Sequence, residues 1–438
     1  MFALARDIRA AGRAVASTRS LLAAAAAAAA LIVLPAAAAY AAGSLFPRAE
    51  QVRPPSDASI GSFNSQLYAT ACTGDRNCVA GGTYDDTLGR SQAFVATESQ
   101  GSWSRRVKVL LPPSAAAQAR AEVEGLACIS AGNCVAVGGF RHDAANDYAL
   151  IATEAHGKWS RGFVPRPPAN ANRVVTYLDA VACTSKGFCE AVGGYTDKAG
   201  HFRAMALAKP VGKGWQQAVE IRAPKGAATD PETTPNGIAC TAVGKCVAVG
   251  TYNLPGSGTH VQAMGAVMSG GGWHRAVRIS LPANALPGYL SYLDGVSCRS
   301  GTCTAVGVYY FGTDAFRAMW VTESSGRFRA GKEIIKAPAD AAPVADTVLG
   351  GISCPPSGRC VADGYYYNTA GHQVAMYMTL ASGRWTASAL KPPLNAGTNS
   401  FQRSAVNAVS CTGTEHCTIA GWYTDAAGHF RSEASSTR

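Results

Sequence analysis

The sequence lacks the short motifs that mark many enzymes. It has no His-Glu-x-x-His zinc motif, no Gly-x-Ser-x-Gly nucleophile motif, no P-loop and no dinucleotide-binding glycine fingerprint. Charged residues are scarce, at 15% of the 438 residues, and the 39 lysines and arginines are scattered. Nucleic-acid binders usually cluster their basic residues, so we expect no nucleic-acid partner. We also expect no cofactor and assign no catalytic residue.

Cysteine is absent outside a repeating series of seven close pairs. The first cysteines of successive pairs are 55 to 58 residues apart, a period typical of a solenoid, a propeller or another array of one supersecondary unit. A zinc site would need two close pairs around one ion, usually with two to four residues between ligands, whereas six of these pairs enclose five residues. Disulfides are therefore favoured. The expected bridges are Cys72–Cys78, Cys128–Cys134, Cys183–Cys189, Cys240–Cys246, Cys298–Cys303, Cys354–Cys360 and Cys411–Cys417.

The first 43 residues have the composition of an export signal. Four arginines and one aspartate precede an apolar run at 21–34, and Ala39-Tyr40-Ala41 follows as a cleavage box. We predict a signal peptide over residues 1–41. An uncleaved membrane anchor is the alternative, because residues 21–42 are long enough to span a bilayer. Removing residues 1–43 would lower the formal net charge from +11 to +8. Paired cysteines fit an exported protein, so we expect it to be secreted or held in the cell envelope.

Repeat three shows the expected unit. A short strand over Leu178–Cys183 is followed by a turn and a returning strand over Cys189–Tyr195. A second turn leads into a third strand at His201–Leu207, and Trp215–Pro224 supplies a fourth. Four short strands linked by hairpins, with a longer return to the next unit, are typical of a propeller blade.

Two positions after each second cysteine are uniform across the repeats. The fourth residue is glycine (Gly82, Gly138, Gly193, Gly250, Gly307, Gly364, Gly421) and the sixth is aromatic (Tyr84, Phe140, Tyr195, Tyr252, Tyr309, Tyr366, Tyr423). Symmetrical pairing about each disulfide would place Asp179 opposite Gly193. We interpret both positions as packing between blades rather than as ligand contacts.

The two ends of the repeat region complement each other. The last repeat stops after its third strand, whereas Phe46–Pro54 resembles the fourth-strand segment Trp215–Pro224. An N-terminal strand that completes the last blade would close the ring and remove the open sheet edges. An open solenoid would instead need capping units. The sequence therefore predicts an all-β fold over residues 44–438, a seven-bladed β-propeller with four antiparallel strands per blade.

The run Cys-x5-Cys-Val-Ala-Val-Gly, as at residues 128–138, resembles a repeat of uncharacterised secreted bacterial β-propellers from about Phe46 to the end of the chain. The turns before the fourth strands, such as Gly101-Ser102-Trp103, are faintly similar to the Asp-box turns of sialidase-like propellers. The Asp-box aspartate and its Ser/Thr-x-Asp frame are absent, and Phe328 replaces the tryptophan in repeat five. The resemblance implies a fold and no particular activity, since propellers host many unrelated functions.

Histidines cluster in one turn of the repeat, between the second and third strands. Five of the eight lie there: His142, His201, His260, His372 and His429. Equivalent turns of neighbouring blades are too far apart to share an ion at the ~2 Å distance of a metal ligand. We interpret these histidines as polar turn residues and expect no metal site.

The fourth position before each first cysteine is mostly polar: Tyr68, Glu124, Asp179, Asn236, Asp294, Gly350 and Asn407. We place it at the start of the innermost strand, at the channel mouth where the long connectors arrive. The side chains either satisfy backbone donors of the incoming connector or contact a ligand. Asp363 is a separate candidate, because the other repeats carry Gly, Val or Ala there. Its carboxylate would face the channel or be exposed to water by a local irregularity.

The long connectors add aromatic groups at the same mouth. Aromatic and amide groups around a shallow pocket suit sugars or extended peptides. We therefore favour a monomeric, secreted, non-enzymatic binding or scaffold protein with a glycan or protein partner at the cell surface. The alternative is a glycan hydrolase or lyase that uses carboxylates at the channel mouth. The opposite face, with its disulfide hairpins and Gly-x-Trp turns, is expected to be inert. The candidate ligand-binding residues are Glu124, Asp179, Asp294, Asn407, Tyr289, Tyr292 and Asp363.

Overall fold

The computed structural model describes residues 44–59, 64–143, 146–256, 261–311, 315–343, 346–356, 358–398, 402–412 and 416–437. The predicted signal peptide or anchor lies outside the described residues. Phe46–Arg438 form one unit, in which all regular structure of the described residues is β-strand. The all-β prediction is therefore confirmed for this part of the chain. The described segments contain no helix that is long and apolar enough to cross a membrane.

Each repeat folds into its own group of short strands, preceded by β1 (Glu50–Gln51). Repeat one contains β2 (Ser65–Gly74), β3 (Asn77–Asp85), β4 (Ser91–Ser99) and β5 (Ser102–Lys108); repeat two contains β6 (Arg120–Ser130), β7 (Asn133–Arg141), β8 (Asp147–Ala155) and β9 (Lys158–Trp159). Repeat three contains β10 (Ala171–Cys183), β11 (Cys189–Asp197), β12 (Phe202–Lys209) and β13 (Val219–Ile221). Repeat four contains β14 (Thr234–Ala242), β15 (Lys245–Asn253), β16 (Val261–Ser269), β17 (Gly272–Trp273) and β18 (Val277–Arg278).

The remaining repeats follow the same order. Repeat five contains β19 (Ser291–Arg299), β20 (Thr302–Phe311), β21 (Ala315–Ser324), β22 (Arg327–Phe328) and β23 (Lys332–Glu333). Repeat six contains β24 (Thr347–Ser353), β25 (Cys360–Tyr367), β26 (Gln373–Ala381) and β27 (Arg384–Ala389). Repeat seven contains β28 (Ser404–Cys411), β29 (Cys417–Thr424) and β30 (Phe430–Ser436). The fourth strand is the shortest and most interrupted element, since repeats four and five split it in two.

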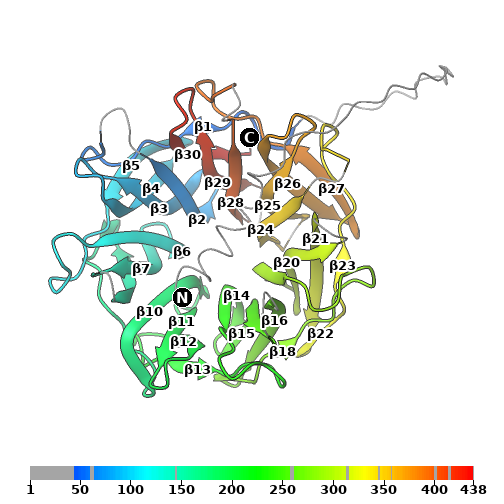
Figure 1. Ribbon diagram of the computed structural model, residues 1–438. Helices are drawn as coiled ribbons and strands as arrows, with labels where there is room; N and C mark the ends of the chain where they lie inside the picture. The colour runs from blue at the N-terminus through cyan, green and yellow to red at the C-terminus, as the bar shows by residue number, and fades with distance from the viewer. Residues whose placement is uncertain are drawn as a thin grey trace. The chain divides into compact units, whose positions relative to one another are not determined.

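Consecutive strands of a repeat pair antiparallel, as in the sheet β2-β3-β4-β5. The described strands form six sheets, because repeats two and three join through one parallel pairing between Val175 of β10 and Asp147 of β8. Figure 1 shows the repeats side by side around a common centre, with first strands such as β2, β14 and β24 nearest to it. This radial arrangement of small antiparallel sheets is a β-propeller.

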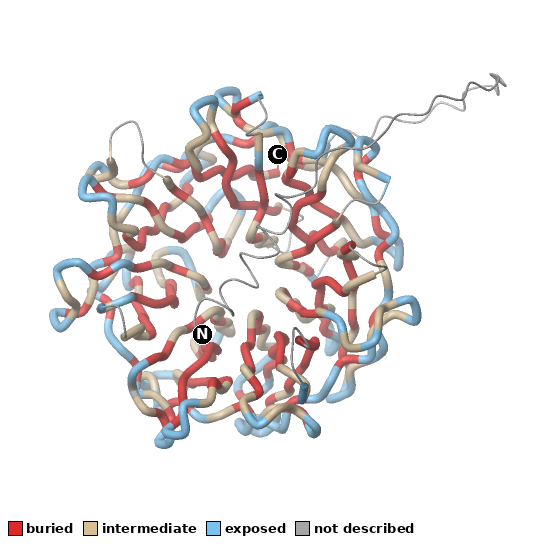
Figure 2. The backbone as a smooth tube through the Cα atoms, in the orientation of Figure 1, coloured by how far each residue is buried: buried red, intermediate tan, exposed pale blue. Residues whose placement is uncertain are grey.

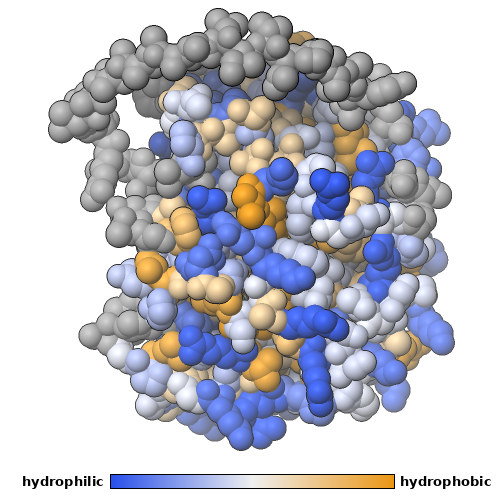
Figure 3. Space-filling model, turned by 90° about the vertical axis from the view of Figure 1, so that its right-hand side faces the viewer, coloured by the Kyte–Doolittle hydropathy of each residue, from blue (hydrophilic) through white to orange (hydrophobic). Residues whose placement is uncertain are grey.

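The core lies between neighbouring repeats. Figure 2 shows buried residues along the strands and exposed residues at the peripheral turns. One side of the rim, seen in Figure 3, is largely hydrophilic with scattered hydrophobic spots. The side chains of Tyr195 and Tyr252 each pack in a cluster that holds residues of two adjacent repeats, as the sequence indicates for this aromatic position. Packing of repeat on repeat therefore supplies the hydrophobic core.

The hydroxyl groups of these buried tyrosines anchor the incoming connectors. Tyr84 donates to Asp57 Oδ1 at 2.6 Å and Tyr366 donates to Asp340 Oδ1 at 2.6 Å. The other described pairs are Tyr195–Asn170, Tyr309–Asn284 and Tyr423–Asn395. In each pair the acceptor lies in the connector that enters the same repeat, so one hydrogen bond ties that connector to the second strand.

The tyrosine of repeat four, Tyr252, differs from these five tyrosines in the hydrogen bonding of its hydroxyl group. The hydroxyl of Tyr252 is buried without a hydrogen-bond partner among the described residues, and repeat two carries Phe140 at the same position. We expect Tyr252→Phe to leave the free energy of unfolding unchanged or to raise it by up to about 1 kcal/mol. Tyr366→Phe should lower it by about 1–3 kcal/mol, because the part-buried hydrogen bond to the Asp340 carboxylate is lost. Urea unfolding measures both free energies. Equal losses of stability in the two variants would show that the hydrogen bond of Tyr366 is not what distinguishes the two positions.

Each innermost strand carries a β-bulge at the same place. In repeat three Leu178 pairs with Gly193 and Ala180 pairs with Val192, so Asp179 is the extra residue. The same shift in pairing falls on Tyr68, Glu124, Asn236, Asp294, Gly350 and Asn407. The expected pairing of Asp179 with Gly193 is therefore wrong by one residue. A bulge inserts one unpaired residue and turns its side chain away from the regular alternation.

The uniform glycine is explained by this bulge. A Cβ atom on Gly193 would lie 2.0 Å from the carbonyl oxygen of Tyr177 in the neighbouring strand of the same sheet. The corresponding distances at the other six glycines are 1.9 to 2.1 Å. Our interpretation of this glycine as packing between blades is thus corrected. It permits close backbone approach within one sheet, where no side chain fits.

Seven disulfides join the cysteines in the pairing that the sequence indicates, each between the first two strands of a repeat. All 14 cysteines lie in described residues and none is free. Each bridge closes a short hairpin and leaves the repeats unlinked. Such bridges persist in oxidising environments and are rare in the cytosol, so they suggest an extracellular location.

The N-terminal strand pairs with the end of the chain. Glu50 and Gln51 of β1 pair with Ala434 and Glu433 of β30, which places β1 as the fourth strand of repeat seven. The side chain of Phe46 is buried against Tyr377, with ring centroids 4.9 Å apart. Phe46 thereby occupies the place that the outer-strand tryptophan takes in most other repeats.

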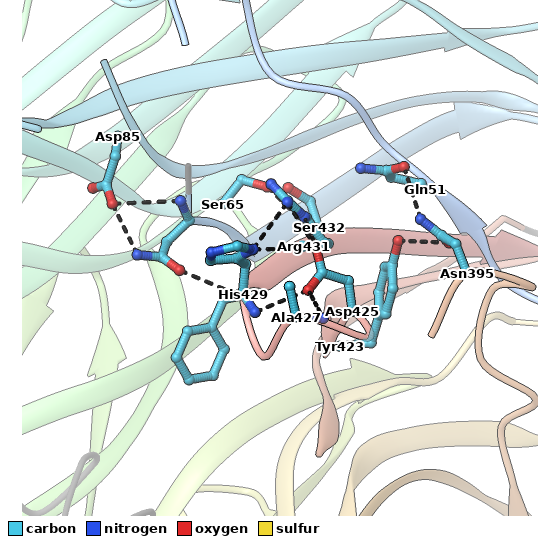
Figure 4. A network of polar contacts seen from close by, with 12 residues as sticks. Gln51, Ser65, Asp85, Asn395, Tyr423, Asp425, Ala427, His429, Arg431 and Ser432 are labelled. Carbon is cyan, nitrogen blue, oxygen red and sulfur yellow. Dashed lines mark hydrogen bonds and ion pairs between the residues drawn. The ribbon is translucent and has the colours of Figure 1, made fainter. Parts of the chain in front are cut away.

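Repeats one and seven also contact each other directly. The backbone N–H of Ser432 donates to Ser65 Oγ at 3.0 Å, and the N–H of Cys72 donates to Ser410 Oγ at 2.9 Å. Figure 4 shows this region, where Asn395 lies between Tyr423 and Gln51. The first and last repeats are therefore neighbours in space.

Candidate functional site

The bulge residues define the candidate site. Glu124, Asp179, Asp294 and Asn407 lie on β6, β10, β19 and β28, the innermost strands of four repeats, and all four are half-buried. They stand within these strands and not at their starts, which corrects their expected position. Because a bulge takes its extra residue out of the regular alternation, the side chains of these four polar residues do not follow the facing pattern of the residues on either side of them.

Two bulge amides link neighbouring repeats. Asn236 Nδ2 donates to the carbonyl oxygen of Leu293 at 3.1 Å and to Asp294 Oδ1 at 2.8 Å. Asn407 Nδ2 donates to the carbonyl oxygen of Leu67 at 2.8 Å, from repeat seven to repeat one. From the sequence, one expectation was that these side chains accept hydrogen bonds from backbone N–H groups of the incoming connector. These amides instead donate to the inner strand of the next repeat, so they have a structural role as well as a place near the centre.

Asp363 lies under the bulge of repeat six and has no exposed surface. A Cβ on Gly351 would lie 2.3 Å from Asp363 Oδ2, and a Cβ on Gly350 would lie 3.3 Å from Oδ1. The carboxyl group thus occupies space that two glycines leave empty, in the one repeat whose bulge residue lacks a side chain. Both expectations for Asp363, a channel-facing group or one exposed to water, are corrected by this burial.

Burial raises the pKa of Asp363 well above its usual range. The charge of Asp294 acts in the same direction, and the nearby Gly351 backbone lowers the pKa by less. Neither carboxyl oxygen makes a hydrogen bond of good geometry to a described residue. A raised pKa means that folding favours the protonated form. The stability that this group supports is present below the pKa of the unfolded chain, near 4, and is lost as pH rises toward the folded pKa.

Asp363→Asn should therefore raise the free energy of unfolding by about 1–3 kcal/mol at pH 7, because the uncharged amide avoids the cost of a buried carboxylate. At pH 4 the substitution should change little, since the native carboxyl is then protonated. Urea unfolding of both proteins at the two pH values tests this. A gain of the same size at pH 4 and pH 7 would show that the ionisation of Asp363 is not responsible.

Two further buried acids escaped the sequence analysis. Burial raises the pKa of Glu433 to about 8 and that of Glu190 to about 7, the latter against a hydrogen bond from Trp273. Glu433 stands where the other repeats carry Phe, Leu or Met, so the repeat comparison that singled out Asp363 could have found it. Both residues lie on second or third strands, away from the innermost strands, and we leave them outside the candidate site.

An aromatic pair joins the connector between repeats four and five, which carries Tyr289, to β20, which carries Tyr310. Tyr289 is 51% exposed and stacks on Tyr310, with centroids 5.4 Å apart and planes 14° apart. Phe316 meets Tyr310 edge-on at 5.0 Å. Tyr292 is buried as the second residue of β19, which corrects its place among the accessible residues. Tyr289 is therefore an accessible aromatic residue, as expected. Tyr310, which was not among the sequence candidates, is its stacking partner.

No three His, Cys, Asp or Glu side chains of the described segments are grouped closely enough to hold a metal ion. The turn histidines make local contacts: His201 Nδ1 lies 3.7 Å from Asp197 and His429 Nδ1 lies 3.5 Å from Asp425. His260 lies outside the described residues. These contacts are those of polar turn residues.

No protein-family model matches the sequence, and no curated protein matches it. Solved structures resemble it at low identity. A protein of unknown function from Dyadobacter fermentans is 9% identical with a TM-score of 0.46, over 90% of this chain and 100% of that chain. A Hadza microbial sialidase is 11% identical with a TM-score of 0.46, over 80% and 74%. The β-propeller domain of the Trilobed protease from Pyrococcus furiosus is 8% identical with a TM-score of 0.44, over 85% and 95%. The pairing of the strands defines the fold.

Proposed function

We propose that this protein is a secreted, closed, seven-bladed β-propeller that binds an extended glycan or peptide around its central channel without transforming it. The blade count is supported by seven sequence repeats that each contribute one bulged inner strand. Closure is supported by the pairing of β1 with β30 and by the hydrogen bonds between repeats one and seven. Export is supported by the N-terminal composition and the seven disulfides.

The observation that carries the binding site is the bulge, repeated once in every repeat. It turns Glu124, Asp179 and Asp294 out of the regular alternation on innermost strands. The exposed ring of Tyr289 stands five residues before Asp294 on the connector that leads into the same strand. Carboxylates and an exposed aromatic face supply hydrogen-bond acceptors and a flat apolar surface, which suits a sugar ring or an extended peptide.

Binding is favoured over catalysis because the three acids with the most strongly raised pKa values are buried. A general acid must keep its proton near neutral pH and touch the substrate. Burial raises the pKa of Asp363, Glu190 and Glu433 in this direction, yet each side chain is at most 1% exposed. These acids cannot reach a substrate in this conformation. A glycan hydrolase or lyase is the alternative, and a turnover screen distinguishes catalysis from binding.

The test pairs a glycan array with a turnover screen on neutral and acidic polysaccharides. We expect saturable binding of at least one glycan and no release of reducing ends or unsaturated products. Tyr289→Ala and Asp179→Ala should each weaken binding about tenfold. Lys186→Ala and Arg384→Ala, on the disulfide side, should leave it unchanged. Product formation would establish the enzymatic alternative, and losses confined to the two controls would move the site to the other face.

A further inference from the structure

In or just before its fourth strand, each repeat contributes one aromatic side chain that packs against the preceding repeat. Trp273 of repeat four donates its indole N–H to Glu190 of repeat three at 2.9 Å. Trp385 of repeat six packs edge-on against Trp320 of repeat five, with centroids 6.2 Å apart. The interface between repeats four and five differs on both sides, because Phe328 replaces the tryptophan and Gly265 faces it.

Phe328 and Gly265 together have the smallest side-chain volume of the seven corresponding pairs. The residues equivalent to Gly265 in the third strands are Val95, Ile151, Ala206, Trp320, Tyr377 and Ala434. The ring of Phe328 has moved over the glycine, where a Cβ would lie 2.2 Å from its Cζ. Space that an indole and a larger neighbour fill in other repeats is therefore left open here.

A pocket of about 660 Å³ opens at this interface. Val267, Met268 and Phe328 contribute apolar wall, and Lys245, Arg275 and Glu323 contribute charged groups. The volume lies in the range of small-molecule sites. The pocket also borders the disulfides of both repeats, on the side that the sequence analysis expected to be inert.

The charges of the pocket favour an anion. Lys245 is exposed and makes no ion pair with the described residues. Arg275 is also exposed and donates Nη1 to the carbonyl oxygen of Ala223 at 2.7 Å, which leaves its other donors for a ligand. Glu323 is buried, and its Oε1 accepts the N–H of Gly326 at 2.7 Å. Lys245 and Arg275 therefore bring two positive charges to the lining of the pocket, while the one carboxylate is engaged by the backbone.

We propose that this pocket binds a small aromatic carboxylate. The flat ring would lie against Phe328 in the space that indoles fill at other interfaces, and the carboxylate would pair with Lys245 and Arg275. The ligand would thus replace a missing part of the blade-to-blade packing. This site is separate from the glycan or peptide site around the channel and does not depend on it.

Isothermal titration of the full-length protein with indole-3-acetate and with the neutral indole-3-acetamide tests the proposal. Indole-3-acetate should bind with a Kd between about 10 µM and 1 mM, as expected for a ligand of this size. Phe328→Trp restores the residue of five other repeats, so it should raise the Kd at least tenfold and should not lower the melting temperature. Lys245→Ala should raise the Kd about three- to tenfold for the acetate and leave that of the acetamide unchanged.

Two controls keep the test specific. Lys186→Ala removes another exposed lysine, from the hairpin of repeat three, and Tyr289→Ala alters the proposed channel site; neither should change the Kd for indole-3-acetate. The proposal is overturned if no saturable binding occurs below about 10 mM, or if both probes bind equally well. It is also overturned if Phe328→Trp binds like the natural protein or melts at a lower temperature. If Tyr289→Ala weakens the binding of indole-3-acetate, the aromatic acid binds at the channel instead.

Discussion

Deletion of residues 46–54 is expected to cost about 5 kcal/mol or more of stability and to cause self-association. Phe46 and Val52 are almost fully buried, and removal of such side chains costs about 2–5 kcal/mol each. The deletion also strips the hydrogen bonds of β1 from β30, leaving an open strand edge that is a template for aggregation. Because single-chain stabilities are about 5–15 kcal/mol, most of the stability should disappear.

Size-exclusion chromatography and urea unfolding measure both effects. Phe46→Ala combined with Val52→Ala keeps the chain length and should lose at least half of the same free energy. Arg53→Ala, at an exposed position in the same segment, should change it by less than about 0.5 kcal/mol. If the deleted protein stays monomeric and melts at the original temperature, β1 is not needed to complete repeat seven.

Gly193→Ala is expected to lower the free energy of unfolding by about 3 kcal/mol or more. Its Cβ would collide with the carbonyl oxygen of Tyr177 and the Cα of Leu178, at 2.0 and 2.6 Å. Those atoms belong to the backbone of the adjacent strand, so no side-chain rotation relieves the contact. The strand must shift away, which disturbs both the bulge and the packing around it.

Gly214→Ala is the matched control in the same repeat. Nothing lies within 4 Å of a Cβ at that position, and its backbone is not left-handed, so the change should be neutral or slightly stabilising. Unfolding by urea compares the two proteins. A loss below about 1 kcal/mol for Gly193→Ala would mean that the close approach is not what requires glycine. Gly421→Ala in repeat seven should likewise lose far more stability than Gly214→Ala.

Much of the architecture could be predicted from local sequence. The spacing of the cysteines indicates seven similar units and their bridges, because each disulfide closes a hairpin within a few residues. The likeness of Phe46–Pro54 to Trp215–Pro224 indicated that the N-terminal segment would supply a fourth strand, and β1 does pair with β30. Both inferences need only patterns that recur along the chain.

The candidate site required the tertiary structure, since it depends on residues opposite one another. The bulge at Asp179 is invisible in one strand, because an extra residue is defined only relative to the partner strand. The burial of Asp363 follows from two glycines on the neighbouring strand, and the pocket at Phe328 follows from Gly265 in another repeat. The sequence by itself determined the repeat, the strand order and the disulfides, which are local or periodic. Only the tertiary structure decided which side chains share a space, because packing depends on the partners that folding brings together.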